Sequence, residues 1–235
     1  AEDFVPRTFE EGPKGTWGTK STAVDCGNLG HPSSFSGWGV TWVATIDLSS
    51  PAVAPIGTIG ILAQSMSTYT STTSMYISTT RWDDLAYEDF VLTRQESPST
   101  DIHAFSFSAD ASDLSYVASG RVIGTLLNSY SMSEYDGALR VATTSFDYDF
   151  GGGQDNGVHI LKVDGSKLNE IGAVNGMGRG ETIQGVRFDG PRGYVVTFRQ
   201  VDPLYVLDLS DPTSPELVGE LKVPGYSTYL KPIDG

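Results

Sequence analysis

The chain has 235 residues, 39% of them hydrophobic, and its 29 acidic and 15 basic residues give a formal net charge of −14. This length and hydrophobic content suffice for one domain with a core, while the acidity argues against nucleic acid and anionic membranes as partners, since both require a basic face. The single cysteine, Cys26, excludes an internal disulfide and a cysteine-based zinc site, and no run of about 20 apolar residues could span a bilayer.

The first 37 residues are rich in Gly, Ser, Thr and Pro and predict a loop-rich segment, in which 23–26 could form a strand. The chain starts at Ala1 without Met or a signal peptide, so we expect a processed or excised piece of a longer protein. We expect Cys26 to be a buried, inert thiol. Four tryptophans crowd the first part of the chain, and buried packing is favoured for them over exposed contact with carbohydrate or protein: Trp17, Trp38, Trp42 and Trp82.

From residue 38 onward, a segment of roughly 50 residues recurs four times. Each copy begins with a short apolar run and continues to a matching glycine: Gly57, Gly120, Gly172 and Gly219. The runs themselves are 45–48, 104–107, 160–163 and 206–209. Period-two alternation of Val, Ile, Thr, Tyr and Phe between Asp-Pro and Asp-Gly turn pairs predicts strands rather than helices.

Four strands in each repeat predict an all-β fold, a β-propeller with about four four-stranded blades that belong to a larger ring. The expected blades are 38–95, 96–150, 151–200 and an incomplete 201–235. The last unit stops before its fourth strand, which would leave a sheet edge open. We expect the N-terminal segment 1–37, the remainder of a longer parent chain or a second copy of this chain to complete it.

Three stretches resemble the family of secreted β-propeller domains that is distantly related to WD-40 repeats: 131–144, 194–212 and 219–227. The likeness covers residues 38–235 and corresponds to the C-terminal part of such a domain. The resemblance implies an extracytoplasmic protein of bacteria or archaea, often attached to the cell surface, with no established catalytic activity. It provides no active-site residues to carry across.

The loop 147–157 concentrates oxygen-bearing side chains among glycines, and its carboxylates are Asp147, Asp149 and Asp155. Hard cations such as Ca²⁺ take six to eight oxygen ligands on a pliable backbone. The EF-hand spacing is absent. The loop is therefore interpreted either as a Ca²⁺ site with these three ligands or as a solvated acidic turn, and no other cofactor is expected.

Two pairs of residues occupy equivalent positions in different repeats. His103 and His159 lie in the strand that would line the channel of a propeller, where two imidazoles could help to hold a transition metal. No third ligand is in register, so hydrogen-bonded structural positions are favoured. Asp47 and Asp208 each precede a Ser and a Pro, which predicts turns whose carboxylates accept backbone N–H groups.

Catalytic motifs give no support for an enzyme: the chain has no G-x-S-x-G elbow, and the glycine-rich run 176–180 is not followed by a predicted helix. We expect a secreted or cell-surface binding or scaffold module that contacts protein or carbohydrate through its loops. One alternative is a hydrolase or lyase that acts on polysaccharide or protein with channel carboxylates. Another is a structural fragment of a noncovalent propeller assembly.

Overall fold

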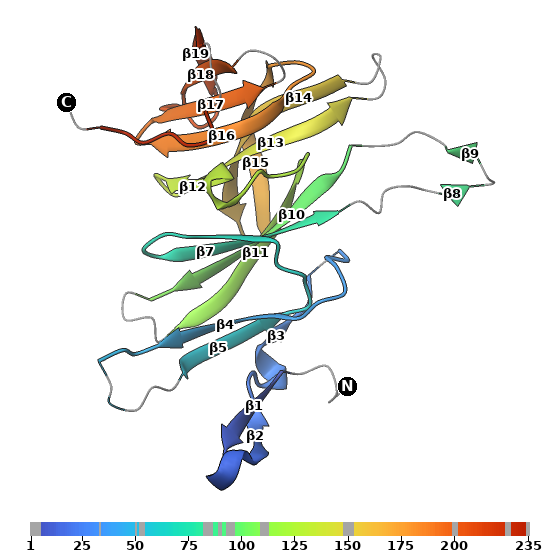
Figure 1. Ribbon diagram of the computed structural model, residues 1–235, viewed down its shortest axis with the longest axis vertical. Coiled ribbons are helices and arrows are strands. Elements are labelled where there is room, and N and C mark those ends of the chain that lie inside the picture. The colour runs from blue at the N-terminus through green and yellow to red at the C-terminus, as the bar shows by residue number, and fades with distance from the viewer. Residues whose placement is uncertain are drawn as a thin grey trace.

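The computed structural model describes residues 6–32, 34–49, 51, 55–81, 87–88, 91–92, 97–108, 113–147, 153–198, 202–223 and 227–233. Within these residues the secondary structure consists of β-strands and one-turn 3₁₀ helices (Figure 1). None of the helices in this part of the chain has the length and apolarity needed to span a membrane. The expected all-β fold is confirmed for the described residues.

The N-terminal segment is more regular than its composition suggests. β1 (Arg7–Glu11) and β2 (Trp17–Thr22) form an antiparallel hairpin around η2 (Pro13–Gly15). The predicted strand at 23–26 is wrong, because the chain there enters η3 (Cys26–Asn28), and Cys26 is exposed rather than buried. β3 (Leu29–Gly30) then pairs in parallel with β5 (Pro55–Ile61), which is antiparallel to β4 (Thr41–Ile46).

The rest of the chain forms three four-stranded antiparallel units. The first contains β6 (Ser67–Thr70), β7 (Ser74–Arg81), β10 (Ser99–Phe107) and β11 (Leu114–Ile123). The second contains β12 (Met132–Tyr135), β13 (Ala138–Asp147), β14 (Gly153–Asp164) and β15 (Lys167–Met177). The third contains β16 (Thr182–Asp189), β17 (Arg192–Phe198), β18 (Asp202–Asp208) and β19 (Glu216–Val223). β8 (Tyr87–Glu88) and β9 (Val91–Leu92), which lie between β7 and β10 in the sequence, pair as a small antiparallel hairpin.

The first two units are joined into one eight-stranded sheet by a parallel bridge between Ser119 of β11 and Lys167 of β15. The sheets therefore do not clearly form four blades. Each predicted repeat nevertheless contains strands, because the four predicted first runs overlap β4, β10, β14 and β18. The runs 45–48 and 206–209 extend past the ends of β4 and β18.

The sequence repeat and the sheets are offset by two strands. The span 96–150 holds β10 to β13, and the span 151–200 holds β14 to β17, so each supplies the end of one unit and the start of the next. β10 and β14 are thus third strands of their units, not the first strands that we expected to line a channel. The two strands of the last span, β18 and β19, join β16 and β17 in one sheet. The boundaries proposed between the spans stay a prediction.

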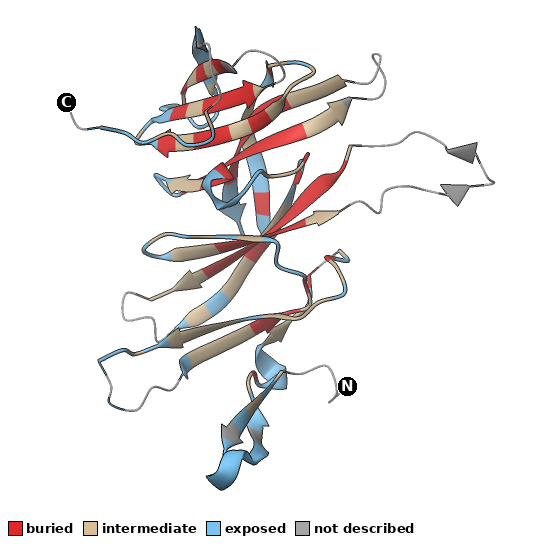
Figure 2. Cartoon of the chain, viewed as in Figure 1, coloured by how far each residue is buried: buried red, intermediate tan, exposed pale blue. Residues whose placement is uncertain are grey.

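The core runs along the middle strands of these units (Figure 2). From Asn156 to Leu161 every residue of β14 is buried, because β14 lies inside its sheet and is covered on both faces. One apolar cluster joins the second and third units, and its members include Val158, Ile160, Val186 and Leu207. The two units are consequently packed together as one body at this point.

Candidate functional site

The middle of the predicted Ca²⁺ loop, residues 148–152, lies outside the described residues. Asp147 pairs with Gly153 where β13 meets β14, and Asp155 is opposite Ser145 in the same ladder. Asp149 is not among the described residues. Within the described part of the chain, no group of three or more His, Cys, Asp or Glu side chains could hold a metal ion. The Ca²⁺ site at Asp147, Asp149 and Asp155 stays a prediction.

The structure does not bring the two repeat-equivalent histidines into one cluster. β10 and β14 are separated in the eight-stranded sheet by β11 and β15. His103 Nδ1 lies 3.1 Å from Tyr116 Oη, whereas His159 Nδ1 lies 2.7 Å from Glu170 Oε2. The interpretation as separate hydrogen-bonded structural positions is therefore the one that the contacts support.

His159 also takes part in a hydroxyl–imidazole–carboxylate row. Its Nε2 lies 3.2 Å from Thr143 Oγ1, on the side opposite to Glu170. This is the order of groups that activates a nucleophile in serine and threonine hydrolases. However, Thr143 is only 1% exposed, so no substrate could reach its hydroxyl. We interpret the row as a structural link across β13, β14 and β15.

Burial of His103 leads to a prediction about acid stability. Desolvation lowers the pKa of His103 below the ordinary imidazole value of 6.5, against a smaller opposing effect of Asp101. As the pH falls below 6.5, the unfolded chain binds a proton at this position before the folded chain does. His103 therefore favours folding above that pH, and this contribution is lost in acid. We expect the urea midpoint to fall less between pH 7.5 and pH 5 in a His103→Gln variant than in the parent.

The exposed His31 provides the matched control. A His31→Gln variant removes an exposed imidazole instead of a buried one, and its urea midpoints at the two pH values give the comparison. If His103→Gln and the parent lose the same stability in acid, burial of His103 is not a source of acid lability.

The predicted aspartate turns are confirmed by identical contacts in two repeats. Asp47 Oδ1 accepts hydrogen bonds from the backbone N–H of Ser49 at 2.8 Å and from its hydroxyl at 2.7 Å. Asp208 Oδ1 accepts the same pair from Ser210, at 3.0 and 2.7 Å. These hydrogen bonds lower the pKa of Asp208. Both carboxylates are thus engaged in the turn that follows a strand.

The preference for buried tryptophans is wrong for three of the four. Trp17 is 67% exposed, Trp38 96% and Trp42 43%, while Trp82 lies outside the described residues. An indole that is almost fully exposed gains little from folding, because its apolar surface stays in water. The loop that contains Trp38 is therefore a candidate contact surface.

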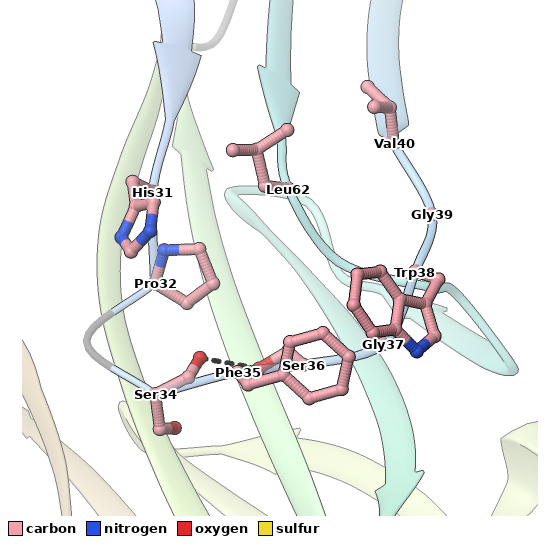
Figure 3. A pocket seen from close by; sticks show the side chains of 10 residues that line it. All are labelled: His31, Pro32, Ser34, Phe35, Ser36, Gly37, Trp38, Gly39, Val40 and Leu62. Carbon is pink, nitrogen blue, oxygen red and sulfur yellow. Dashed lines mark hydrogen bonds between the residues drawn. The ribbon is translucent and has the colours of Figure 1, made fainter. Parts of the chain in front are cut away.

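Trp38 borders a pocket of about 390 Å³ between the loop 31–40 and the end of β5 (Figure 3). Phe35 and Trp38 meet edge to face, with ring centroids 4.9 Å apart. In the close-up, His31 and Pro32 lie on the opposite side of the pocket from Trp38. Its other walls come from small or apolar residues: Ser34, Ser36, Gly37, Gly39, Val40 and Leu62. The volume is within the range of small-ligand and side-chain pockets, roughly 300–1,000 Å³.

The buried carboxylate of Asp101 and the guanidinium of Arg121 anchor this loop to the first four-stranded unit. The hydroxyl of Ser36 donates to Asp101 Oδ2 at 3.0 Å, and Arg121 Nε donates to Asp101 Oδ1 at 2.7 Å. Arg121 Nη2 also donates to Ser34 Oγ at 3.3 Å. Asp101 is buried, so its hydrogen bond from Ser36 is shielded from water, whereas the side chain of Arg121 is partly exposed. They hold the pocket wall in one conformation.

The backbone of the loop is held as well. The N–H of Gln64 donates to the carbonyl of Ser36 at 2.8 Å. Gly37 has φ +92°, and a Cβ there would lie 2.8 Å from Gln64 Cβ, so glycine is required for both conformation and space. Sequence reasoning noticed Trp38 but missed the pocket. Only the clustering of tryptophans pointed to it, since Asp101 and Arg121 are distant in the sequence.

Comparison with known proteins places the chain among all-β repeat domains. A family model described as a β-propeller domain matches residues 1–235. An uncharacterized protein of Methanocaldococcus jannaschii is 50% identical over 117 residues, which are 50% of this chain and 18% of that protein. An uncharacterized protein of Archaeoglobus fulgidus is 43% identical over 154 residues, which are 66% of this chain and 22% of that protein. The matched region thus spans less than a quarter of either relative.

Proposed function

Because this chain belongs to the β-propeller domain family, we propose that it is a binding module whose contact surface includes the pocket between Phe35 and Trp38. The observation that carries this proposal is the 96% exposed indole of Trp38, presented by a loop that is anchored to buried Asp101. Exposed tryptophans on preorganised loops are typical of binding hot spots, because little ordering entropy is lost when a partner covers them.

The occupant that we propose is an apolar side chain of a protein segment. The pocket presents mainly aromatic and aliphatic surface: Phe35, Trp38, Val40, Leu62 and Pro32. The hydroxyl of Ser36 is already engaged with Asp101 and with the carbonyl of Ser34. A sugar needs several hydrogen-bonding groups at its rim. This pocket therefore suits an aromatic or long aliphatic anchor better than a carbohydrate.

Selection from a random peptide library displayed on phage tests the proposal. Selected peptides should share an aromatic or long aliphatic residue, and a Trp38→Ala variant should bind them at least about 30-fold more weakly, as for a hot-spot residue. Trp17→Ala is the matched control, because Trp17 is also exposed but lies in the β1–β2 hairpin. Its affinity should equal that of the parent.

Peptides that bind the parent and Trp38→Ala equally would overturn this assignment of the contact surface. A selection that yields no binder would count equally against a protein segment as the occupant. Turnover of a polysaccharide or protein substrate by the purified domain would instead favour the alternative of a hydrolase or lyase.

We also propose that the repeated units are blades of a larger propeller, completed by the remainder of a longer parent chain or by a second copy. Support comes from the offset four-strand repeat. A single species of 25.2 kDa that unfolds cooperatively would argue against a noncovalent assembly.

A secreted or cell-surface location rests on the family resemblance and would be tested by labelling intact cells. Calcium at the 147–155 loop would be supported by a higher unfolding temperature on addition of Ca²⁺.

A further inference from the structure

A second pocket, of about 360 Å³, lies where the first strands of the three four-stranded units meet. β6, η4 (Ser129–Ser131) with β12, and β16 each supply part of its wall, and η4 contacts both β6 and β16. Its walls differ from those of the Phe35–Trp38 pocket, because aromatic rings alternate with hydroxyl groups and a guanidinium. The residues that decide its chemistry are Tyr69, Tyr130, Phe188, Ser129, Ser133 and Arg187.

Tyr130 is presented at this pocket by a braced turn. Its backbone N–H donates to Asn128 Oδ1 at 2.9 Å, and the N–H of Asn128 donates to Ser131 Oγ at 3.4 Å. The ring is 52% exposed and meets Tyr229 edge to face, with centroids 6.2 Å apart. A ring held in this way offers a stacking surface with little ordering cost on binding.

Positive charge collects beside these rings, although the whole chain has a net charge of −14. Arg187 lines the pocket, and within the described residues its Nε is buried without a hydrogen-bond partner. The buried Arg140 lies behind the wall, with its guanidinium 4.8 Å from the centre of the Phe188 ring. Arg140 Nη2 donates to Ser133 Oγ at 2.8 Å, which orients one of the hydroxyls of the pocket.

Burial lowers the pKa of Arg140 to about 10, so this guanidinium still carries its charge at pH 7. Two arginines therefore lie at one small pocket, and of the two Arg187 lines it, while Arg140 interacts with the carboxylate of Asp189. A buried N–H without a partner is costly unless a ligand or water satisfies it. Since Arg187 lines the pocket, an anionic group bound there would lie beside its guanidinium.

We propose that this pocket binds a carboxylate-bearing sugar, such as a hexuronic acid unit of an acidic glycan. The sugar ring would stack on Tyr130, its hydroxyl groups would meet Ser129, Ser133 and the threonines Thr68 and Thr70, and its carboxylate would pair with Arg187. A neutral sugar would keep the stacking and lose the ion pair. An inorganic anion would keep the ion pair and lose the stacking.

Titration of the folded chain with sodium D-glucuronate, D-glucose and sodium sulfate, followed by amide chemical shifts, tests the proposal. Glucuronate should shift the resonances of β12 and β16 and bind at least tenfold more tightly than glucose or sulfate. Arg187→Gln should remove the preference for glucuronate over glucose. Tyr130→Ala should abolish binding of both sugars.

Trp17→Ala and Arg192→Gln are matched controls, since both residues are exposed and neither lines the pocket. Both should bind glucuronate as the parent does. Equal binding of glucuronate and glucose, no binding at 50 mM, or an unchanged preference in Arg187→Gln would each overturn the proposal. Because Trp38 is not part of this pocket, a failure here leaves the peptide-binding proposal untouched.

Discussion

Replacing Asn156 by alanine is expected to lower the free energy of unfolding by about 4 kcal/mol, the scale for a buried polar network with several lost partners. Asn156 is fully buried in β14. Its Nδ2 lies within hydrogen-bonding distance of the carbonyls of Met177 at 2.8 Å, Glu181 at 3.0 Å and Gly178 at 3.2 Å. Its Oδ1 accepts from the hydroxyl of Thr144 at 2.7 Å.

This network joins two of the four-stranded units. Thr144 Oγ1 in turn accepts the backbone N–H of Ile183 in β16 at 3.2 Å. Alanine would take the amide donor from the carbonyls of Met177, Gly178 and Glu181, of which that of Gly178 keeps the N–H of Glu181 at 2.9 Å. Water could not replace the amide unless the sheets separated. The loss therefore includes the desolvation cost of the partners as well as the hydrogen bonds themselves.

Urea unfolding of the purified domain measures this loss. Asn156→Asp should be at least as destabilising as Asn156→Ala, because it points an acceptor at three carbonyls. Asn169→Ala is the control: Asn169 is exposed and its side chain reaches Asp164 at 3.5 Å, so a change within about 0.5 kcal/mol is expected. A loss below about 1 kcal/mol for Asn156→Ala would show that the network does not hold the units together.

Replacing Gly120 by alanine is expected to cost about 3 kcal/mol, the upper part of the range for overpacking. Gly120 lies in β11, next to β15 of the second unit. A Cβ at this position would lie 2.3 Å from the carbonyl oxygen of Leu168 and 2.6 Å from its Cβ. These atoms belong to or adjoin the backbone of a paired strand and cannot rotate away, so β15 would have to move.

The repeat itself supplies the control for this prediction. Gly219 occupies the equivalent position in β19, but a Cβ there would meet nothing closer than Val206 Cβ at 3.7 Å, an ordinary contact. Gly219→Ala should therefore change stability by less than about 1 kcal/mol, with a small gain from the stiffer unfolded chain. Chemical denaturation of the two variants side by side gives the comparison. Equal losses would show that the glycine serves strand conformation in every repeat rather than the approach of adjacent units.

Local sequence determined the elements of this protein. Alternation of apolar and polar residues predicted strands because the side-chain period of a strand depends only on its own backbone. The turns at Asp47 and Asp208 were predictable for the same reason, since a carboxylate two residues before its donors needs no distant partner. The matching positions of β4, β10, β14 and β18 also follow from the repeat alone.

Tertiary structure decided how those elements are grouped and which side chains meet. A sequence repeat shows how often a pattern recurs, but not at which strand one sheet ends and the next begins. Only the hydrogen bonds between strands show that the sheet boundaries lie two strands away from the boundaries of the predicted spans. Likewise, His103 and His159 occupy equivalent positions in the sequence, which suggested a pair. In the structure each contacts a residue on its own neighbouring strand, Tyr116 for His103 and Glu170 for His159.

The candidate site shows most clearly what cannot be predicted from the sequence alone. Trp38 is recognisable in the sequence, but its exposure depends on Ser36 bonding to Asp101, a residue 65 positions away. Burial and long-range hydrogen bonds are properties of packing between segments, which no local pattern encodes. The sequence therefore determined an all-β repeat chain with its strands and turns, and the packing of distant segments alone decided where that chain offers a binding surface.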